Sequence, residues 1–119
     1  MIVTMQNQVA VAANTTNPNV LTGQRYERAP FQAGVGNLFC CGSAAGLTAE
    51  LNVGGVSVTP PTVVNTQNRL PVVPDDILVS EWECMNGQLL QVTVVNTTGG
   101  ALTFFWRVDI EEADIEVAG

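Results

Sequence analysis

The chain has 119 residues, of which 46% are hydrophobic and only 13% are charged. A chain of this length and composition can bury one core, so we expect a single domain over residues 1–119. Four arginines, no lysine, no histidine and eleven acidic residues give a net charge of −7. So few cations cannot neutralise many phosphates, and we expect no direct binding to nucleic acid or to an anionic membrane surface.

The residue types that are missing exclude most enzyme chemistries. Without histidine the commonest general base and most zinc sites are lost, and without lysine there is no Schiff-base chemistry. We therefore expect no enzyme activity, no metal site and no cofactor. The sequence lacks a run of about 18 apolar residues, so no membrane-spanning helix is expected. The first residues also lack the basic start and apolar run of a signal peptide.

The cysteines Cys40, Cys41 and Cys84 do not suit a disulfide framework. Two adjacent cysteines cannot bridge each other without straining the peptide bond between them. We expect all three to be reduced side chains in the core. A bridge from Cys40 or Cys41 to Cys84 and a three-thiolate metal site are the alternatives.

The N-terminal part of the chain is weakly patterned. We expect residues 1–37 to form an extended N-terminal arm or an edge segment, with one strand around Val9 and Val11. Residues 14–19 have the composition of a loop. The glycines between residues 33 and 46 suit bends, or places where another group approaches the backbone closely.

Residues 47–58 predict a β-hairpin. Apolar residues alternate from Leu47 to Val53, Gly54-Gly55 supplies a two-residue turn, and Val56 and Val58 follow. Pro60-Pro61 is expected to end the second strand, because proline cannot donate a hydrogen bond to a ladder. Residues 62–76 then form a connection with one short strand at 62–64.

Residues 77–110 contain the strongest β pattern and predict a three-stranded meander. Its strands would span 77–84, 88–96 and 101–110, joined by three-residue loops, with Gly87 in a left-handed conformation. This register keeps the apolar faces together. The rows that face the core would be Trp82–Leu90–Val108, Ser80–Val92–Trp106 and Leu78–Val94–Phe104. The fold class that follows is all-β, and the short strands and frequent turns favour a single antiparallel β-sandwich or a barrel.

The opposite face of this meander is partly apolar and predicts a subunit interface. A solvated sheet face would not need four large apolar residues, so either the N-terminal segment or another subunit is expected to cover them. Two charged residues, paired across the strands, would form the polar rim. The predicted interface residues are Ile77, Val79, Val95, Phe105, Glu81 and Arg107. The expected assembly is a homo-oligomer.

Acidic residues gather before and after this region. Asp75-Asp76 and the acidic tail, residues 111–119, are expected to be solvated, with calcium binding or docking to a basic partner as alternatives. Glu81 and Glu83 flank Trp82, as paired carboxylates do beside an aromatic residue in glycosidases. The tryptophan would point away from both, so we expect an exposed or interface face rather than catalysis.

The stretch from Val94 to Ile110 resembles the closing strands of small β-sandwich cement or decoration proteins on the capsids of tailed bacteriophages. The resemblance implies a jelly roll that trimerises on the capsid surface, binds the major capsid protein and has no catalysis or cofactor. It transfers no individual functional residue. The implied location is the virion, after synthesis in the host cytoplasm. The alternative is a carbohydrate- or receptor-binding module of a phage fibre or surface protein, which would have only Tyr26 and Phe31 as free aromatic residues.

Overall fold

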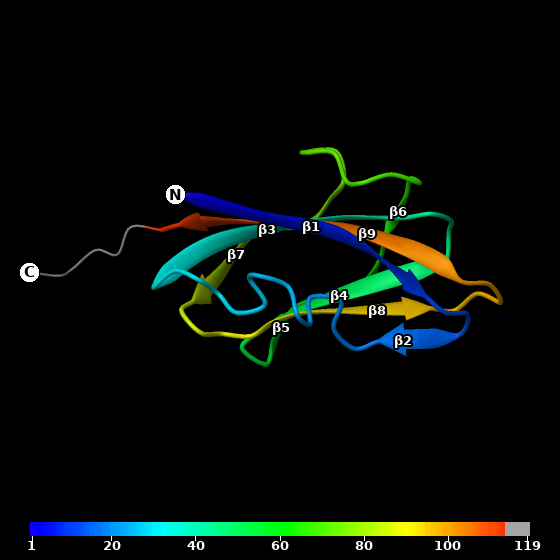
Figure 1. Cartoon of the computed structure of the whole chain (residues 1–119), viewed down its shortest axis with the longest axis horizontal. Coiled ribbons are helices and arrows are strands. Elements are labelled where there is room, and N and C mark those ends of the chain that lie inside the picture. The colour runs from blue at the N-terminus through cyan, green and yellow to red at the C-terminus, as the bar shows by residue number, and fades with distance from the viewer. Residues whose placement is uncertain (114–119) are drawn as a thin grey trace, which may run out of the picture.

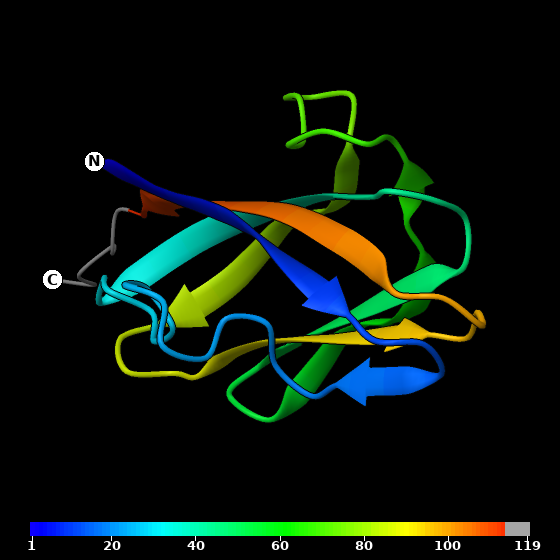
Figure 2. The same ribbon diagram turned by 45° about the vertical axis from the view of Figure 1, so that its right-hand side comes forward.

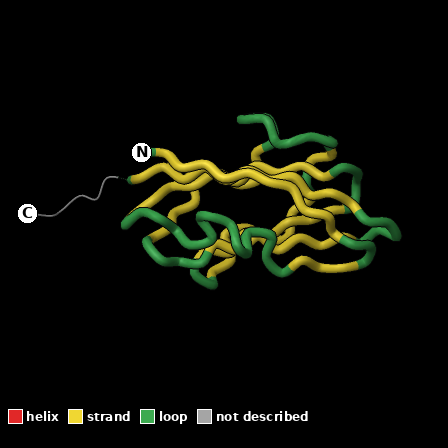
Figure 3. Tube along the Cα trace, in the orientation of Figure 1, coloured by secondary structure: helices red, strands yellow, loops and turns green. Residues whose placement is uncertain are grey.

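The computed structural model describes residues 1–113 and forms an all-β sandwich, which confirms the predicted fold class (Figures 1 and 3). In this part of the chain the structure contains nine strands and no helix. The strands are β1 (Ile2–Val11), β2 (Thr15–Asn17), β3 (Ala33–Gly42), β4 (Leu47–Val53), β5 (Val56–Val63), β6 (Asn65–Thr66), β7 (Ile77–Met85), β8 (Leu90–Asn96) and β9 (Leu102–Glu112). Consequently, residues 1–113 contain no helix that is long and apolar enough to span a membrane.

Two sheets form the layers of the sandwich. The first sheet has the order β1-β9-β3, and the far side of β3 pairs with β7 along one half and with β6 along the other. The second sheet has the order β2-β8-β4-β5. Every pairing is antiparallel except the short β3–β6 pair. The views in Figures 1 and 2 show the chain passing repeatedly from one layer to the other.

The predicted meander of β7, β8 and β9 is wrong. Strand β7 pairs with β3, β8 pairs with β2 and β4, and β9 lies between β1 and β3. Trp82 is therefore opposite Gly36 rather than Leu90, and Leu90 is opposite Val53. The two turns carry the chain between sheets instead of closing hairpins. The first of them still has the expected left-handed glycine, since Gly87 has a φ of 84°.

Of the nine residues predicted to face the core, seven are buried, whereas Leu78 is half-buried and Ser80 is exposed. Large buried side chains from both sheets meet between the layers, and they include Trp82, Leu90, Val92, Val94, Phe104, Trp106 and Val108. The ring of Trp82 occupies the space beside Gly36, where an added Cβ would lie 2.3 Å from the ring. Gly36 is thus a site of close approach, as expected of the glycines in this segment. All three cysteines are free and buried.

The β4–β5 hairpin forms as predicted, but its second strand is longer. Gly54 and Gly55 have φ values of 59° and 84°, which suit a type I′ turn between Val53 and Val56. Strand β5 continues through Pro60-Pro61 to Val63, so the expected stop at the prolines is wrong. An edge strand tolerates proline because its outer amides need no partner in the sheet.

The ends of the described chain lie together in the first sheet. Strand β1 contains Val9 and Val11 and forms an edge strand beside β9, with Ile2 opposite Glu111. Residues 15–17, inside the segment that was expected to be a loop, instead form β2, an edge of the second sheet. Glu111 and Glu112, which were predicted to begin the acidic tail, are the last residues of β9. Residues 114–119 of that tail, including Asp114 and Glu116, lie outside the described residues.

Candidate interaction surface

The six residues predicted to form a subunit interface do not share one surface. Val95 belongs to β8 in the second sheet, whereas the other five belong to β7 and β9 in the first. Phe105 is only 8% exposed, while Ile77 is 40% exposed and Val79 packs against the core. Since β3 separates β7 from β9, the predicted set is divided even within the first sheet.

The predicted ion pair between Glu81 and Arg107 is also absent from the described part of the chain. Arg107 Nε instead donates to Asp109 Oδ1 at 3.0 Å on its own strand. Glu81 is exposed and has a φ of 55°, and its backbone amide donates to Asn37 Oδ1 at 3.0 Å. The separation of β7 from β9 by β3 explains why these two side chains do not pair.

The connection between β6 and β7 lies beside β3 on the outer side of the first sheet. We call residues 67–76 the projecting loop. The Gln67 amide donates to the Gly42 carbonyl, and the Cys40 amide donates to the Asp76 carbonyl, each at 3.0 Å. These bonds fix both ends of the projecting loop beside β3, and Figures 1 and 2 show it standing on the side of the first sheet that faces away from the second. Cys41 of β3 and Phe105 of β9 lie opposite each other, and both are buried although they face away from the second sheet.

Asp76 holds the projecting loop in shape from its inside. It is 3% exposed, and its carboxylate accepts hydrogen bonds from Val72 N at 2.8 Å and Asn65 Nδ2 at 3.4 Å. Arg69 forms a salt bridge to the same carboxylate from a side chain that is 40% exposed. The Asp76 amide in turn donates to the Val72 carbonyl at 3.0 Å. One carboxylate therefore connects the beginning, the tip and the end of the loop.

The pKa values agree with a network built around a carboxylate. Burial alone would raise the pKa of Asp76, but its hydrogen bonds, first of all that from Val72 N, lower it to about 2. Burial, together with the Asp76 carboxylate, raises the pKa of Cys41 to about 12. Burial likewise raises the pKa of Cys40 and of Cys84. All three thiols stay protonated at neutral pH, and such thiols are poor nucleophiles.

The projecting loop exposes several aliphatic side chains to solvent. Leu70, Val72 and Val73 are 41%, 43% and 44% exposed, and Ile77 at the start of β7 continues the patch. The polar residues Gln67, Asn68 and Asp75 are exposed as well, so the three aliphatic side chains form the middle of the loop, while Asp76 is buried. Apolar side chains exposed on a loop that hydrogen bonds hold in place are typical of a surface that binds another protein. We call Leu70, Val72, Val73 and Ile77 the apolar tip.

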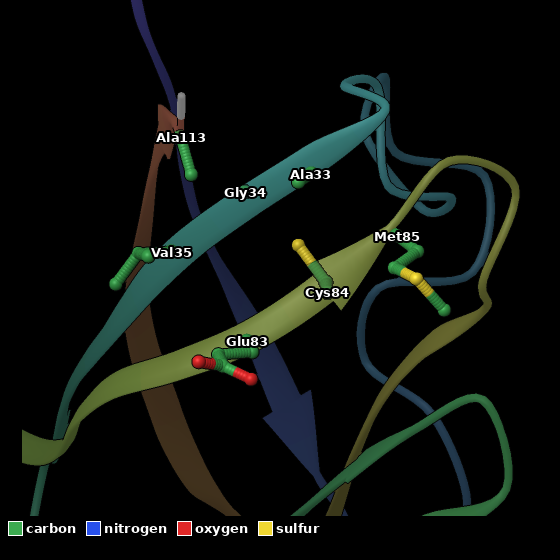
Figure 4. Close-up of a pocket in the computed structure, with 7 residues that line it drawn as sticks. All are labelled: Ala33, Gly34, Val35, Glu83, Cys84, Met85 and Ala113. Carbon is green, nitrogen blue, oxygen red and sulfur yellow. The ribbon is translucent and has the colours of Figure 1, made fainter. Parts of the chain in front are cut away.

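A second feature, a shallow cavity of about 280 Å³, lies between the ends of β3 and β7 (Figure 4). Cys84 and Glu83 project from opposite sides of β7 there, so the thiol and the carboxylate do not converge. The other lining residues are Ala33, Gly34, Val35, Met85 and Ala113. Over residues 1–113, no group of three or more His, Cys, Asp or Glu side chains is placed to hold a metal ion.

The aromatic residues expected to be free for ligand binding are largely engaged. Phe31 is only 9% exposed and belongs to the core. Tyr26 packs against the core, and the Arg25 guanidinium lies 5.4 Å from the centre of its ring. Phe31 was therefore wrongly taken to be free, because the weak pattern of residues 1–37 did not show which of its apolar residues reach the core.

Apart from Ile77, the residues of the apolar tip were not predicted from the sequence to lie on an interaction surface. The signal available was the sequence Leu70-Pro71-Val72-Val73-Pro74, in which apolar residues occupy a segment whose prolines disfavour a central strand. Comparison of the sequence with models of known protein families and with curated proteins finds no match.

Proposed function

We propose that this protein is a non-enzymatic structural protein of a viral capsid, a decoration or cement subunit that binds the major capsid protein through its apolar tip. The observation that carries the proposal is the exposure of three aliphatic side chains on a loop that is held from inside by the buried Asp76. A buried carboxylate network is costly unless it is fully hydrogen-bonded, and here it fixes the loop with aliphatic side chains facing solvent. A rigid tip of this kind can enter an apolar groove with little loss of conformational entropy.

The order of the strands supports the proposal at the level of the fold. With the two-residue β6 set aside, the orders β1-β9-β3-β7 and β2-β8-β4-β5 are those of two interleaved Greek keys, and we propose that the sandwich is a jelly roll. Jelly rolls serve as capsid subunits and also as lectins. This support is an analogy between folds, so the choice between a capsid protein and a carbohydrate-binding module depends on the apolar tip.

The proposed subunit acts on the virion surface, where it bridges or reinforces capsid proteins, and it needs no cofactor. Its homotrimer, which was inferred from the sequence, stays a prediction, since the residues assigned to that interface do not share one surface. The apolar tip faces the shell in this arrangement. The remaining sides of the sandwich are then free to contact neighbouring copies.

Binding to purified shells that lack the protein tests the proposal. A variant with Leu70→Ser, Val72→Ser and Val73→Ser should bind at least about a hundredfold more weakly, since each aliphatic side chain contributes about 1 kcal/mol or more when buried. The matched control changes Val56, Val58 and Val63 of the β5 edge to serine, since these residues are also exposed. The control should keep wild-type affinity for the shells.

Two results would contradict the proposal. One is equal shell binding by the wild type and the tip variant. The other is no shell binding together with specific affinity for a glycan on an array, which would favour the carbohydrate-binding module.

A further inference from the structure

The exposed edges of the two sheets differ in how they are protected from pairing with other chains. Natural edge strands avoid such pairing by prolines, charges, irregular register or short length. Strand β5 has Pro60-Pro61 and register shifts, and β7 has Glu81, Glu83 and register shifts. Strands β2 and β6 contain only three and two residues. Each of these edges therefore carries at least one protective device.

Strand β1 is the exception. It is ten residues long, and its register with β9 runs without a shift from Ile2 to Val11. It contains no proline and no charged side chain, and the first charged side chain in the whole sequence is that of Arg25. Within residues 1–113, β1 pairs with β9 alone. A long, regular and uncharged edge of this kind is a template for adding another strand.

The backbone of β1 offers hydrogen-bonding groups at this edge. The Glu112 amide donates to the Met1 carbonyl at 2.8 Å. Because bonded and non-bonded pairs alternate along an antiparallel ladder, the odd-numbered residues of β1 bond to β9 and the even-numbered residues turn their amides and carbonyls outward. One outward amide, that of Gln8, is held by the neighbouring Asn7 Oδ1 at 2.8 Å. A partner strand can replace this local contact.

We propose that β1 pairs with β1 of a second copy of this chain, antiparallel, about a two-fold axis that passes through Asn7. The sequence of β1 is nearly symmetric about that residue. The pairing sets Gln6 opposite Gln8 of the second copy and Thr4 opposite its Ala10. On the core-facing side, Met5 meets Val9 of the second copy and Val3 meets its Val11. The side-chain carboxamides of Gln6 and Gln8 thus meet each other, and apolar side chains meet apolar side chains.

This register also satisfies the backbone and the charges. It pairs even-numbered residues with even-numbered residues, which are those whose amides and carbonyls point outward. An uncharged strand meets its own copy without like-charge repulsion, whereas self-pairing of β7 would bring Glu81 and Glu83 close to the same residues of the copy. The contact is isologous and closes on itself, so the first sheet continues across two molecules without forming a fibre.

A cross-link at the axis tests the pairing in the full chain. Asn7 and its copy form a non-hydrogen-bonded pair, whose Cα atoms lie about 4.5 Å apart, within the range of a disulfide. The Asn7→Cys variant should form a covalent dimer under mild oxidation, seen on a non-reducing gel. The control Ser57→Cys, at an exposed position on the β5 edge, should form no covalent dimer and run as a single chain on the same gel. Absence of the Asn7→Cys dimer would overturn the pairing.

The solution mass of the unmodified chain gives a second test. Wild type should contain an even number of chains, either two or, if the predicted trimer also forms, six. The double variant Gln6→Lys, Gln8→Lys places lysines opposite lysines and should lose the two-fold contact, while its far-UV circular dichroism spectrum shows that the chain stays folded. The control Ser57→Lys, Asn86→Lys adds the same charge elsewhere and should keep the wild-type mass.

A wild-type mass of one or three chains would overturn the proposal, including the case in which a different protein occupies the β1 edge. The pairing of β1 does not depend on the proposed function. The apolar-tip variant, which should fail to bind shells, should keep the even-numbered mass.

Discussion

Asp76 is the residue that determines the shape of the projecting loop, and its ionisation should affect stability. Its pKa is about 2 in the folded protein, below the ordinary value of 3.8. Because the folded-state pKa is depressed, the carboxylate stabilises the fold above about pH 4, and this contribution is lost as the pH falls from about 4 to about 2. The hydrogen bonds that the carboxylate accepts are the cause of its lowered pKa.

We predict that Asp76→Asn lowers the free energy of unfolding by about 1–3 kcal/mol at pH 7, since a buried network loses its charge and part of its hydrogen bonding. The difference between wild type and variant should shrink as the pH falls from 4 to 2. Urea unfolding at a series of pH values measures it. A difference that is independent of pH would show that the Asp76 charge does not stabilise the fold.

Trp106 tests the assignment of the core. It is 1% exposed and lies on β9 in the middle of the first sheet. Trp106→Ala should lower the free energy of unfolding by about 3–5 kcal/mol, because it removes a large buried side chain and leaves a cavity. Chemical denaturation followed by far-UV circular dichroism measures the change. A loss below about 1 kcal/mol would contradict the burial of this side chain.

At the level of the elements, the alternation of apolar residues predicted the direction of side chains but not the pairing of strands. Strands β8 and β9 turn alternate residues toward the core, and so does the second half of β7, with Trp82 and Cys84. In a sandwich, two strands that face each other across the core have the same alternation as two neighbours in one sheet. The short turns after β7 and β8 favoured hairpins, and only long-range pairing with β3 and β4 decides otherwise.

The projecting loop was harder to predict for a related reason. Its shape depends on the hydrogen bonds that the buried Asp76 accepts. The position of the loop depends in turn on backbone hydrogen bonds to Cys40 and Gly42 of a strand that is distant in the sequence. Composition alone assigned Asp76 to solvent. By contrast, the β4–β5 hairpin depends on the local sequence Gly54-Gly55 and was predicted with its correct turn.

Paired cysteines distinguish the observed strand pairing from the meander. Glu50 and Thr93 face each other on β4 and β8, so the Glu50→Cys, Thr93→Cys variant should form an intramolecular disulfide. Val79 and Thr93 would be neighbours only in the meander. The Val79→Cys, Thr93→Cys variant should therefore keep both new thiols free after mild oxidation, as measured by mass spectrometry. A disulfide between the two introduced cysteines would show that the meander is the correct pairing.

At the scale of the whole molecule, the fold depends on contacts between the two ends of the chain. Strand β9 is the inner partner of both β1 and β3, and it supplies four fully buried side chains, Phe104, Trp106, Val108 and Ile110. A chain that ends at residue 101 should remain unfolded, because neither β1 nor β3 can complete a sheet without it. Dispersion of its NMR amide signals measures folding, and native-like dispersion would contradict the prediction.

The pairing of β1 with β9 also determines how the molecule would respond to a pulling force. Met1 and Glu112 are hydrogen-bonded neighbours, so tension applied between these two residues loads the ladder one bond at a time, as a zipper opens. Tension applied along β1 from a partner strand would instead load many bonds of that ladder together in shear. The fold should therefore resist force weakly when it is pulled at Met1 and Glu112. It should resist force strongly when it is pulled along β1 by a paired strand.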